Sequence, residues 1–189
     1  MGTNRICEIV RSLRTFSRLD ESDLKSVNLH AGLESTLMIL QNRLKAKPDI
    51  QEICLEKQYG EIPLIECHAG QMNQVFMNIL VNAIDAIDSA GMRKPDQPQP
   101  RIILQTEVQN NGVTITIQDS GPGISEEMQK RIFDPFFTTK PVGQGTGMGL
   151  SVSYQIVTAK HGGKLNCISK LGQGSQFIIH LPISRADSV

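Results

Sequence analysis

Two asparagines, Asn78 and Asn82, stand one helical turn apart in a segment whose apolar residues recur at helical spacing. Their side chains therefore lie on one polar arc of the expected helix. Amide oxygens are hard, neutral ligands, and they suit a Mg²⁺ ion whose charge is already balanced by a polyphosphate. Taken alone, the pair is equally consistent with ordinary asparagines on a helix surface.

A carboxylate follows a later apolar strand, where Asp119 opens the run Asp-Ser-Gly-Pro-Gly that ends at Gly123. Glycines after a strand let the backbone come close to a flat ligand. The carboxylate can accept a hydrogen bond from an exocyclic amine such as the adenine N6. A turn closed by the aspartate side chain explains the run equally well by itself.

Glycines occupy alternate positions in Gly-Gln-Gly-Thr-Gly-Met-Gly-Leu, residues 143–150, directly before an expected helix. Such a run exposes several backbone N–H groups beside a helix N-terminus, which is a site for anions such as phosphates. A flexible surface loop is the alternative, but it leaves the regular alternation unexplained. A second glycine turn, Gly172–Gly174, leads into a strand that contains Ser175.

Several common phosphate-binding and nucleophile motifs are absent from the sequence. It has no G-x-x-x-x-G-K-[ST] loop, no G-x-G-x-x-G after a strand and no G-x-S-x-G turn. The HRD and DFG motifs are missing too, which excludes a protein kinase of the Ser/Thr/Tyr type.

The composition is that of a soluble globular protein. The 189 residues include 19 basic and 19 acidic side chains and are 39% hydrophobic. The balanced charge argues against a nucleic-acid partner, and no apolar stretch reaches the roughly 18 residues of a membrane span. The four cysteines lack metal-binding spacing, so we expect reduced thiols and a cytoplasmic location.

The order of expected elements indicates a layered α/β arrangement with helices over one face of a mixed sheet. A first helix, residues 1–20, has an apolar stripe without a partner helix before it. Residues 20–27 are expected to form a polar hinge, and Asn28 to cap a second helix that runs to about Lys45. Further helices are expected at 70–90, 125–133 and 150–160, and strands at 53–57, 64–67, 102–108, 113–118, 164–169 and 174–181.

Taken in this order, the four segments resemble the N, G1, G2 and G3 boxes of the ATP-binding domain of sensor histidine kinases, within the gyrase, Hsp90 and MutL superfamily. Residues 133–140, Phe-Asp-Pro-Phe-Phe-Thr-Thr-Lys, are similar to the F box of that family. The resemblance covers residues 60–182. It implies an α+β fold, the Bergerat ATP-binding fold, which is a two-layer α/β sandwich. In this fold a mixed sheet of about five strands is covered on one face by three helices.

The N-terminal segment resembles the second helix of that family's dimerisation and phosphoacceptor hairpin. The resemblance therefore implies a hairpin remnant over residues 1–21 and a catalytic ATP-binding domain over residues 22–189. It also implies a homodimer in the full-length protein. We expect no membrane contact by this segment itself, whether or not the parent protein is anchored.

Site roles follow from the resemblance, with ATP and Mg²⁺ as the cofactors. Asn82 is expected to bind Mg²⁺, and Asn78 to assist at the metal or the phosphates. Asp119 is expected to bind the adenine amine, with Ser175 behind it, and Lys140 to meet a phosphate. The resemblance also implies apolar walls and backbone contacts to ATP from Ala83, Ile87, Gly121, Gly123, Ile124, Gly145, Thr146, Gly147, Met148, Gly149 and Leu150.

ATPases of the superfamily carry a glutamate, the base for the attacking water, where this chain has Asn78, whose amide cannot take a proton. The resemblance therefore implies slow hydrolysis and transfer of the γ-phosphate to a histidine, then to a response-regulator receiver domain. None of the four histidines, His30, His68, His161 and His180, has the H-box sequence of the family. The phosphoacceptor is expected upstream, so this chain alone should not phosphorylate itself. An ATP-binding pseudokinase and an ATPase of the superfamily remain as alternatives.

Overall fold

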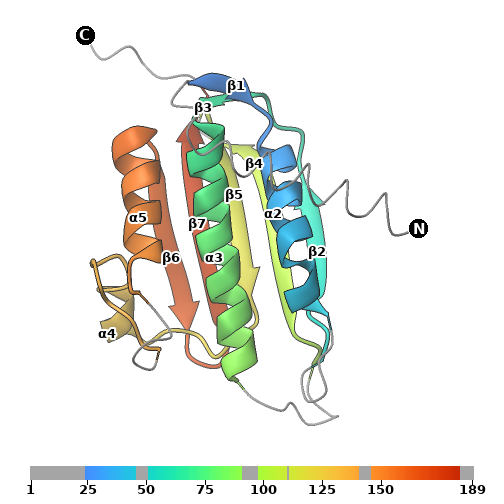
Figure 1. Ribbon diagram of the computed structural model, residues 1–189, viewed down its shortest axis with the longest axis vertical. Coiled ribbons are helices and arrows are strands. Elements are labelled where there is room, and N and C mark those ends of the chain that lie inside the picture. Colours follow the sequence, from blue (N-terminus) through green and yellow to red (C-terminus); the bar gives the residue numbers. More distant parts are fainter. Residues whose placement is uncertain (1–23, 46–50, 91–97, 110, 141–145, 184–189) are drawn as a thin grey trace.

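The computed structural model describes residues 24–45, 51–90, 98–109, 111–140 and 146–183. A five-stranded sheet forms one layer, and helices α2, α3 and α5 cover one of its faces (Figure 1). The predicted α+β sandwich is therefore confirmed. The elements are β1 (Lys25–Val27), α2 (Leu29–Leu44), β2 (Cys54–Tyr59), β3 (Ile65–Cys67), α3 (Ala69–Ser89), β4 (Arg101–Gln109), β5 (Gly112–Asp119), α4 (Glu126–Gln129), α5 (Gly149–Gln155) with its π-helical continuation Ile156–Lys160, β6 (Lys164–Lys170) and β7 (Gly174–Pro182).

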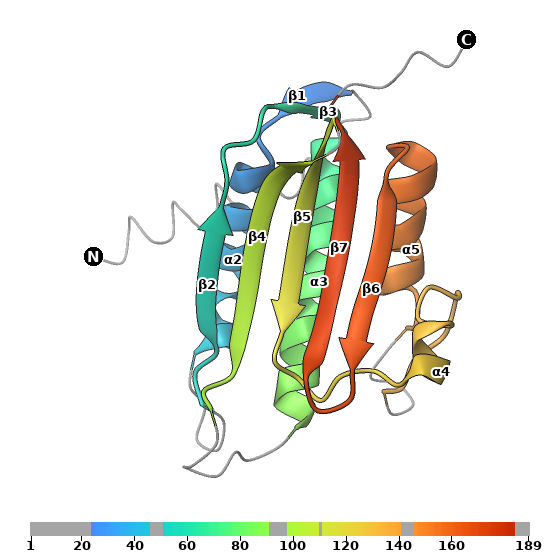
Figure 2. The ribbon, with the colours of Figure 1, turned by 180° about the vertical axis from the view of Figure 1, so that it is seen from behind.

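The strands of the main sheet lie in the order β2-β4-β5-β7-β6, and only the β2–β4 pair is parallel. The predicted hairpin joins β4 to β5, with Asn111 at φ 60° in its turn. Figure 2 shows the opposite face of the sheet, over which no described helix packs. The register sets Asp119, the last residue of β5, against Ser175 of β7.

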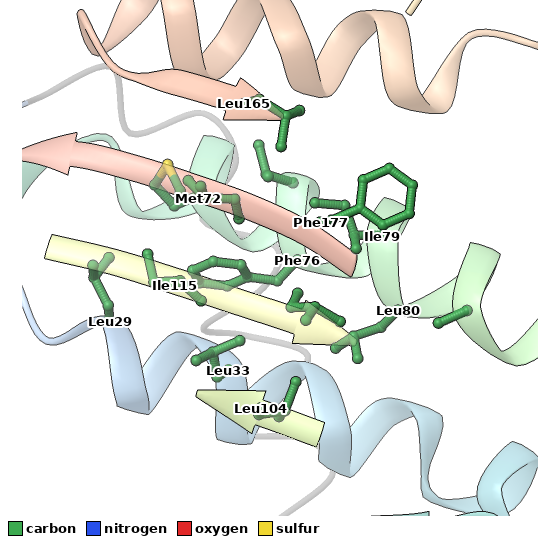
Figure 3. Packing of buried hydrophobic residues seen from close by; sticks show 14 of the residues in the cluster. Leu29, Leu33, Met72, Phe76, Ile79, Leu80, Leu104, Ile115, Leu165 and Phe177 are labelled. Atoms are coloured by element: carbon green, nitrogen blue, oxygen red, sulfur yellow. The ribbon is translucent and has the colours of Figure 1, made fainter. Parts of the chain in front are cut away.

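The core lies between the sheet and the three helices, and α3 is its central element (Figure 3). Phe76, Ile79 and Leu80 of α3 are fully buried against Leu33 of α2 and Ile115 of β5. Apolar residues at i, i+3 and i+4 give α3 one buried stripe, and the polar arc of the helix lies on another side, away from the core. At the N-terminus of α2, Asn28 caps the helix as predicted, since its Oδ1 accepts a hydrogen bond from Ala31 N at 3.3 Å.

Two predicted elements differ from the structure. The expected hinge at 20–27 includes strand β1, because Lys25–Val27 pairs antiparallel with β3 some forty residues later. The helix expected over 125–133 ends at Gln129. Tight turns follow, with Arg131 N donating to Met128 O and Asp134 N to Arg131 O, both at 2.8 Å.

The described cysteines, Cys54, Cys67 and Cys167, are free thiols, as expected. Burial raises the pKa of Cys67 to about 12, so this thiol is protonated and inert at neutral pH. Cys7 and the first expected helix lie outside the described residues. Within the described ranges, no helix combines the length and the apolar character that crossing a membrane requires.

Candidate functional site

A cleft of about 950 Å³ lies between the C-terminal half of α3, the end of β5, α4 and the start of α5. This volume is ample for a nucleotide-sized ligand. The cleft is lined by Asn78, Val81, Asn82, Asp85, Ala86, Asp88, Ser89, Asp119, Pro122, Gly123, Ile124, Met128, Ile132, Phe137, Thr138, Thr139, Lys140, Thr146, Gly147, Gly149, Leu150, Ser175 and Phe177. Residues predicted from four separate sequence segments are thus brought together in one place.

Asp119 is the buried carboxylate of this cleft, with 3% of its surface exposed. Its Oδ1 accepts a hydrogen bond from Gly121 N at 2.7 Å. Burial raises its pKa to about 6, against the opposing effect of backbone hydrogen bonds from Gly121 and Ser175. At neutral pH the group is therefore largely a carboxylate, and it can accept a further hydrogen bond from a ligand amine.

The glycines beside Asp119 allow close backbone approaches that a side chain would block. Gly174 has φ +88°, and a Cβ there would lie 1.9 Å from Asp119 O. Gly123 has φ +76°, and a Cβ there would lie 2.2 Å from Lys170 O. Both positions need the left-handed backbone and the missing side chain of glycine.

Ser169 supports this end of the cleft, although no motif of the sequence points to it. Its hydroxyl lies 3.0 Å from Ser175 Oγ and 2.8 Å from Gly174 O, and it accepts a hydrogen bond from Ile124 N at 2.8 Å. A prediction of the β6–β7 register could have found it, because this register pairs Ser169 with Ser175 across the turn. Ser169 therefore ties the glycine turn to the segment after β5.

The two asparagines of α3 make different contacts. Asn78 Nδ2 donates to Gly149 O at 2.9 Å and to Ser153 Oγ at 3.1 Å, so it joins α3 to the first turn of α5. Asn82 Oδ1 accepts a hydrogen bond from Lys140 Nζ at 3.4 Å. Its oxygen faces the cleft beside a cation, whereas both donors of Asn78 reach toward α5.

An ion-pair network surrounds Lys140 and was not predicted. Lys140 Nζ donates to Asp85 Oδ2, and Arg43 Nη2 of α2 donates to Asp85 Oδ1 at 2.5 Å. Arg43 also lies 3.5 Å from Asp88 Oδ2. Asp85 belongs to the same polar arc of α3 as Asn78 and Asn82, and this position could have indicated that it is a residue of the cleft.

The backbone of the segment around Lys140 packs closely on the glycine-rich run. Gly147 has φ +65°, and a Cβ there would lie 2.4 Å from the carbonyl carbon of Phe136. Phe136 has a positive φ of 66° and a side chain that is 73% exposed. Phe137 lines the cleft instead, with the Arg131 guanidinium 4.8 Å from its ring centre.

Comparison with known proteins identifies the family. Residues 67–185 match the family model described as "Histidine kinase-, DNA gyrase B-, and HSP90-like ATPase". The chain belongs to this family. The signal transduction histidine-protein kinase AtoS of Escherichia coli K12 is 35% identical over 95% of this chain. The chain spans 27% of the length of AtoS.

Solved structures agree with this assignment. The catalytic domain of histidine kinase ThkA is 29% identical, with a TM-score of 0.70 over 86% of this chain and 97% of that domain. A ThkA structure in complex with the response regulator TrrA shares the fold, with a TM-score of 0.64 and 24% identity over 96% of this chain and 49% of that one. The fold is therefore that of histidine kinase catalytic domains.

Two residues that the resemblance places at the ATP site do not belong to the lining of the cleft. Ala83 and Ile87 are each 2% exposed and belong to the core, not to the cleft lining. The helical period explains this, because both lie on the apolar stripe of α3. Apolar side chains of the lining come instead from Ala86, Ile132 and Phe177.

Two further predicted residues, Gly121 and Met148, also lie outside the lining. Gly121 is buried behind Asp119, where a Cβ would lie 2.7 Å from the carboxylate oxygen. Met148 is 43% exposed and does not line the cleft. Gly145 lies outside the described residues. The remaining predicted residues of the glycine-rich run, Thr146, Gly147, Gly149 and Leu150, all line the cleft.

The four histidines have structural partners. His161 is buried, with Nδ1 donating to Ile156 O at 2.8 Å and Nε2 accepting from His68 N at 3.0 Å. His30 stacks on Tyr59 with ring centres 4.4 Å apart, beside a separate hollow of about 420 Å³ at the start of α2. His180 lies 3.2 Å from Thr114 Oγ1. The expectation that none of them is a phosphoacceptor stays a prediction.

Proposed function

We propose that this chain is the ATP-binding catalytic part of a two-component sensor histidine kinase that acts in the cytoplasm. In the complete protein, the γ-phosphoryl group would leave ATP and bond to a histidine nitrogen on a dimerisation hairpin. ADP would be the other product. The phosphoryl group would then pass to an aspartate of a response-regulator receiver domain, in keeping with the complex of ThkA with TrrA.

The observation that carries this proposal is that the cleft has chemically different groups at its different parts. Asp119, a buried hydrogen-bond acceptor suited to an adenine amine, lies at one part of the lining. Asn82 and Lys140, an amide oxygen and a cation suited to metal and phosphate, lie at another. Gly147, Gly149 and Leu150, from the glycine-rich run and the N-terminus of α5, line the same cleft, and the backbone N–H groups of a helix start suit phosphate.

The oxygens on α3 fit a Mg²⁺ ion that arrives with a nucleotide. Asn82 Oδ1 already faces a cation in the cleft, and the Asp85 carboxylate lies on the same cation. Mg²⁺ in such sites keeps most of its ligands from phosphates and water, so one or two protein oxygens suffice. When bound, the ion would neutralise the charge that develops on the phosphates during transfer.

Asn78 favours a kinase over a hydrolase. Its amide has no basic group for a water molecule, and its Nδ2 is engaged by both Gly149 O and Ser153 Oγ. ATP bound here would therefore persist until an acceptor histidine reaches the γ-phosphate. Phe136 is exposed beside the cleft. We assign it as a residue that would contact the dimerisation hairpin of the complete protein.

The test mixes the chain with ATP labelled at the γ-phosphate and a fragment that carries the hairpin of the complete protein. We expect the label to appear on the hairpin as an acid-labile, alkali-stable phosphohistidine, with little inorganic phosphate released. Steady phosphate release without labelling would identify a hydrolase instead. Nucleotide binding without either product would identify a pseudokinase.

A further inference from the structure

The cleft contains a cation that belongs to the protein itself. The ammonium of Lys140 is shared by Asp85 Oδ2 and, at 3.4 Å, by Asn82 Oδ1. Asn82 and Asp85 are three residues apart on α3, so their side chains project from the same side of the helix. Two oxygens of different chemical type therefore converge on one positive charge. We call these two oxygen-bearing side chains the cation seat.

Asp85 carries a full negative charge in this position. Burial alone would raise its pKa, but the hydrogen bonds and charges of Lys140 and Arg43 outweigh burial and hold the pKa below its usual value. Arg43 binds the other carboxylate oxygen, Oδ1, from α2. Arg43 therefore uses one carboxylate oxygen and leaves Oδ2 to Lys140 in the cleft.

An amide oxygen beside a carboxylate is a pair that Mg²⁺ prefers as protein ligands. An ammonium ion uses the same oxygens as hydrogen-bond acceptors, so the two cations compete for them. We propose that Asp85 is a second residue of the metal site beside Asn82, and that Lys140 fills the cation seat until a metal–nucleotide binds. This inference rests on the proposed function, since the metal would arrive with the nucleotide.

The exchange gives Lys140 a second role. Once it leaves Asp85 and Asn82, its three N–H donors become available to phosphate oxygens that enter the same part of the cleft. The position of Lys140 is then coupled to the metal and not to the adenine end of the ligand. The alternative is that Asp85 only joins α2 to α3 through Arg43 and has no part in metal binding.

Calorimetric titration with ADP, with and without Mg²⁺, separates these two roles. The measured quantity is the gain in ADP affinity that Mg²⁺ produces. In Asp85→Asn we expect this gain to fall by about tenfold, the size typical for partners around a metal. The affinity for metal-free ADP should not fall, because a negative charge near the phosphates has been removed.

Arg43→Gln is the matched control, because it breaks the link from α2 to α3 and leaves Asp85, Asn82 and Lys140 in place. Its Mg²⁺-dependent gain should not fall, because the change removes a positive charge near the metal and leaves Oδ2 in the cleft. If Arg43→Gln reproduces the loss seen in Asp85→Asn, the role of Asp85 is structural and the proposal is wrong. A gain in Asp85→Asn equal to that of the wild type overturns it as well.

Lys140→Met keeps the proposal testable if Asp85→Asn does not fold, because the Lys140 side chain is 33% exposed and its loss leaves the core intact. Without the competing ammonium, Mg²⁺ alone, with no nucleotide phosphates for Lys140 to bind, should raise the melting temperature of Lys140→Met more than that of the wild type, and equal shifts overturn the proposal. Failure of the proposed function looks different: the wild type would then bind no ADP under either condition.

Discussion

Asp119 combines a buried charge with backbone donors, and its raised pKa makes stability depend on pH. The pKa in the folded state, about 6, lies above the ordinary value of 3.8, so the folded state binds more protons between these values. The contribution of Asp119 to stability is therefore fully present below about pH 4 and is lost as pH rises through 6.

Comparison of wild type with Asp119→Asn by urea unfolding between pH 4 and 7 measures this effect. The difference in unfolding free energy should move in favour of the wild type on acidification by up to about 3 kcal/mol, at about 1.4 kcal/mol per pH unit. Parallel stability curves for the two proteins would show that Asp119 titrates normally.

Asn78 illustrates how one side chain can support both the fold and the site. Asn78→Asp keeps the size of the side chain but removes both donors, so an acceptor would face Gly149 O and Ser153 Oγ. We expect the unfolding free energy to fall by about 1–3 kcal/mol. Ser153→Ala, which removes one partner only, should cost less. If Asn78→Asp lowers the unfolding free energy no more than Ser153→Ala does, the contacts described for Asn78 are contradicted.

The positions of residues in the cleft were predictable where a side chain belongs to a short local motif, while their roles stay predictions. Asp119 and its glycines fall in one run, and of the site residues predicted there only Gly121 lies outside the cleft lining. Ala83 and Ile87, which the resemblance suggested as apolar walls, lie toward the core as the helical period of α3 indicates, and their role at the ATP site stays a prediction. Asp85 was visible on the polar arc, but its partners Arg43 and Lys140 are more than forty residues away in the sequence.

At the scale of elements, the cleft depends on how closely the glycine-rich run packs against Phe136. Gly147→Ala would place a Cβ 2.4 Å from the Phe136 carbonyl carbon and would strain the backbone at φ +65°. The segment that carries Lys140 must then shift. We expect ATP affinity to fall by about tenfold, which corresponds to about 1.4 kcal/mol and lies within the range expected for such backbone strain.

Gly172→Ala is the control for this substitution. Gly172 has a similar φ of +77°, but a Cβ added there would have no atom within 4 Å. The substitution should lower stability by about 1–2 kcal/mol through backbone strain alone and leave ATP affinity unchanged. Equal effects of the two variants on calorimetric ATP binding would show that the contact with Phe136 is irrelevant to the site.

Elements with a strong local signal were predicted well, and those fixed by distant partners were not. The period of α3 and the Asn-Gly turn between β4 and β5 are local features. Strand β1 has three residues and exists because β3 pairs with it, so no local pattern could reveal it. The helix at 125–133 was predicted too long because the turns after Gln129 are set by hydrogen bonds to nearby carbonyl groups, not by periodicity.

At the scale of the molecule, one layer of helices leaves the second face of the sheet without a described helix (Figure 2). The cleft lies where β5 ends, between α3 and the start of α5. The layered fold was predictable because the order of helices and strands restricts the arrangement. The proposed boundary between residues 1–21 and the rest stays a prediction, since residues 1–23 lie outside the described part.

The most direct test of the central claim is calorimetric titration with ATP of the wild type and Asp119→Asn. The carboxylate receives two backbone donors, from Gly121 and Ser175, and an amide would turn its own N–H groups toward one of them or toward the ligand amine. We predict Mg²⁺-dependent binding in the wild type and a loss of about a hundredfold or more in Asp119→Asn. Glu107→Gln, at an exposed position of β4, should bind as the wild type does. Equal binding by Asp119→Asn, or none by the wild type, would contradict an adenine site in this cleft.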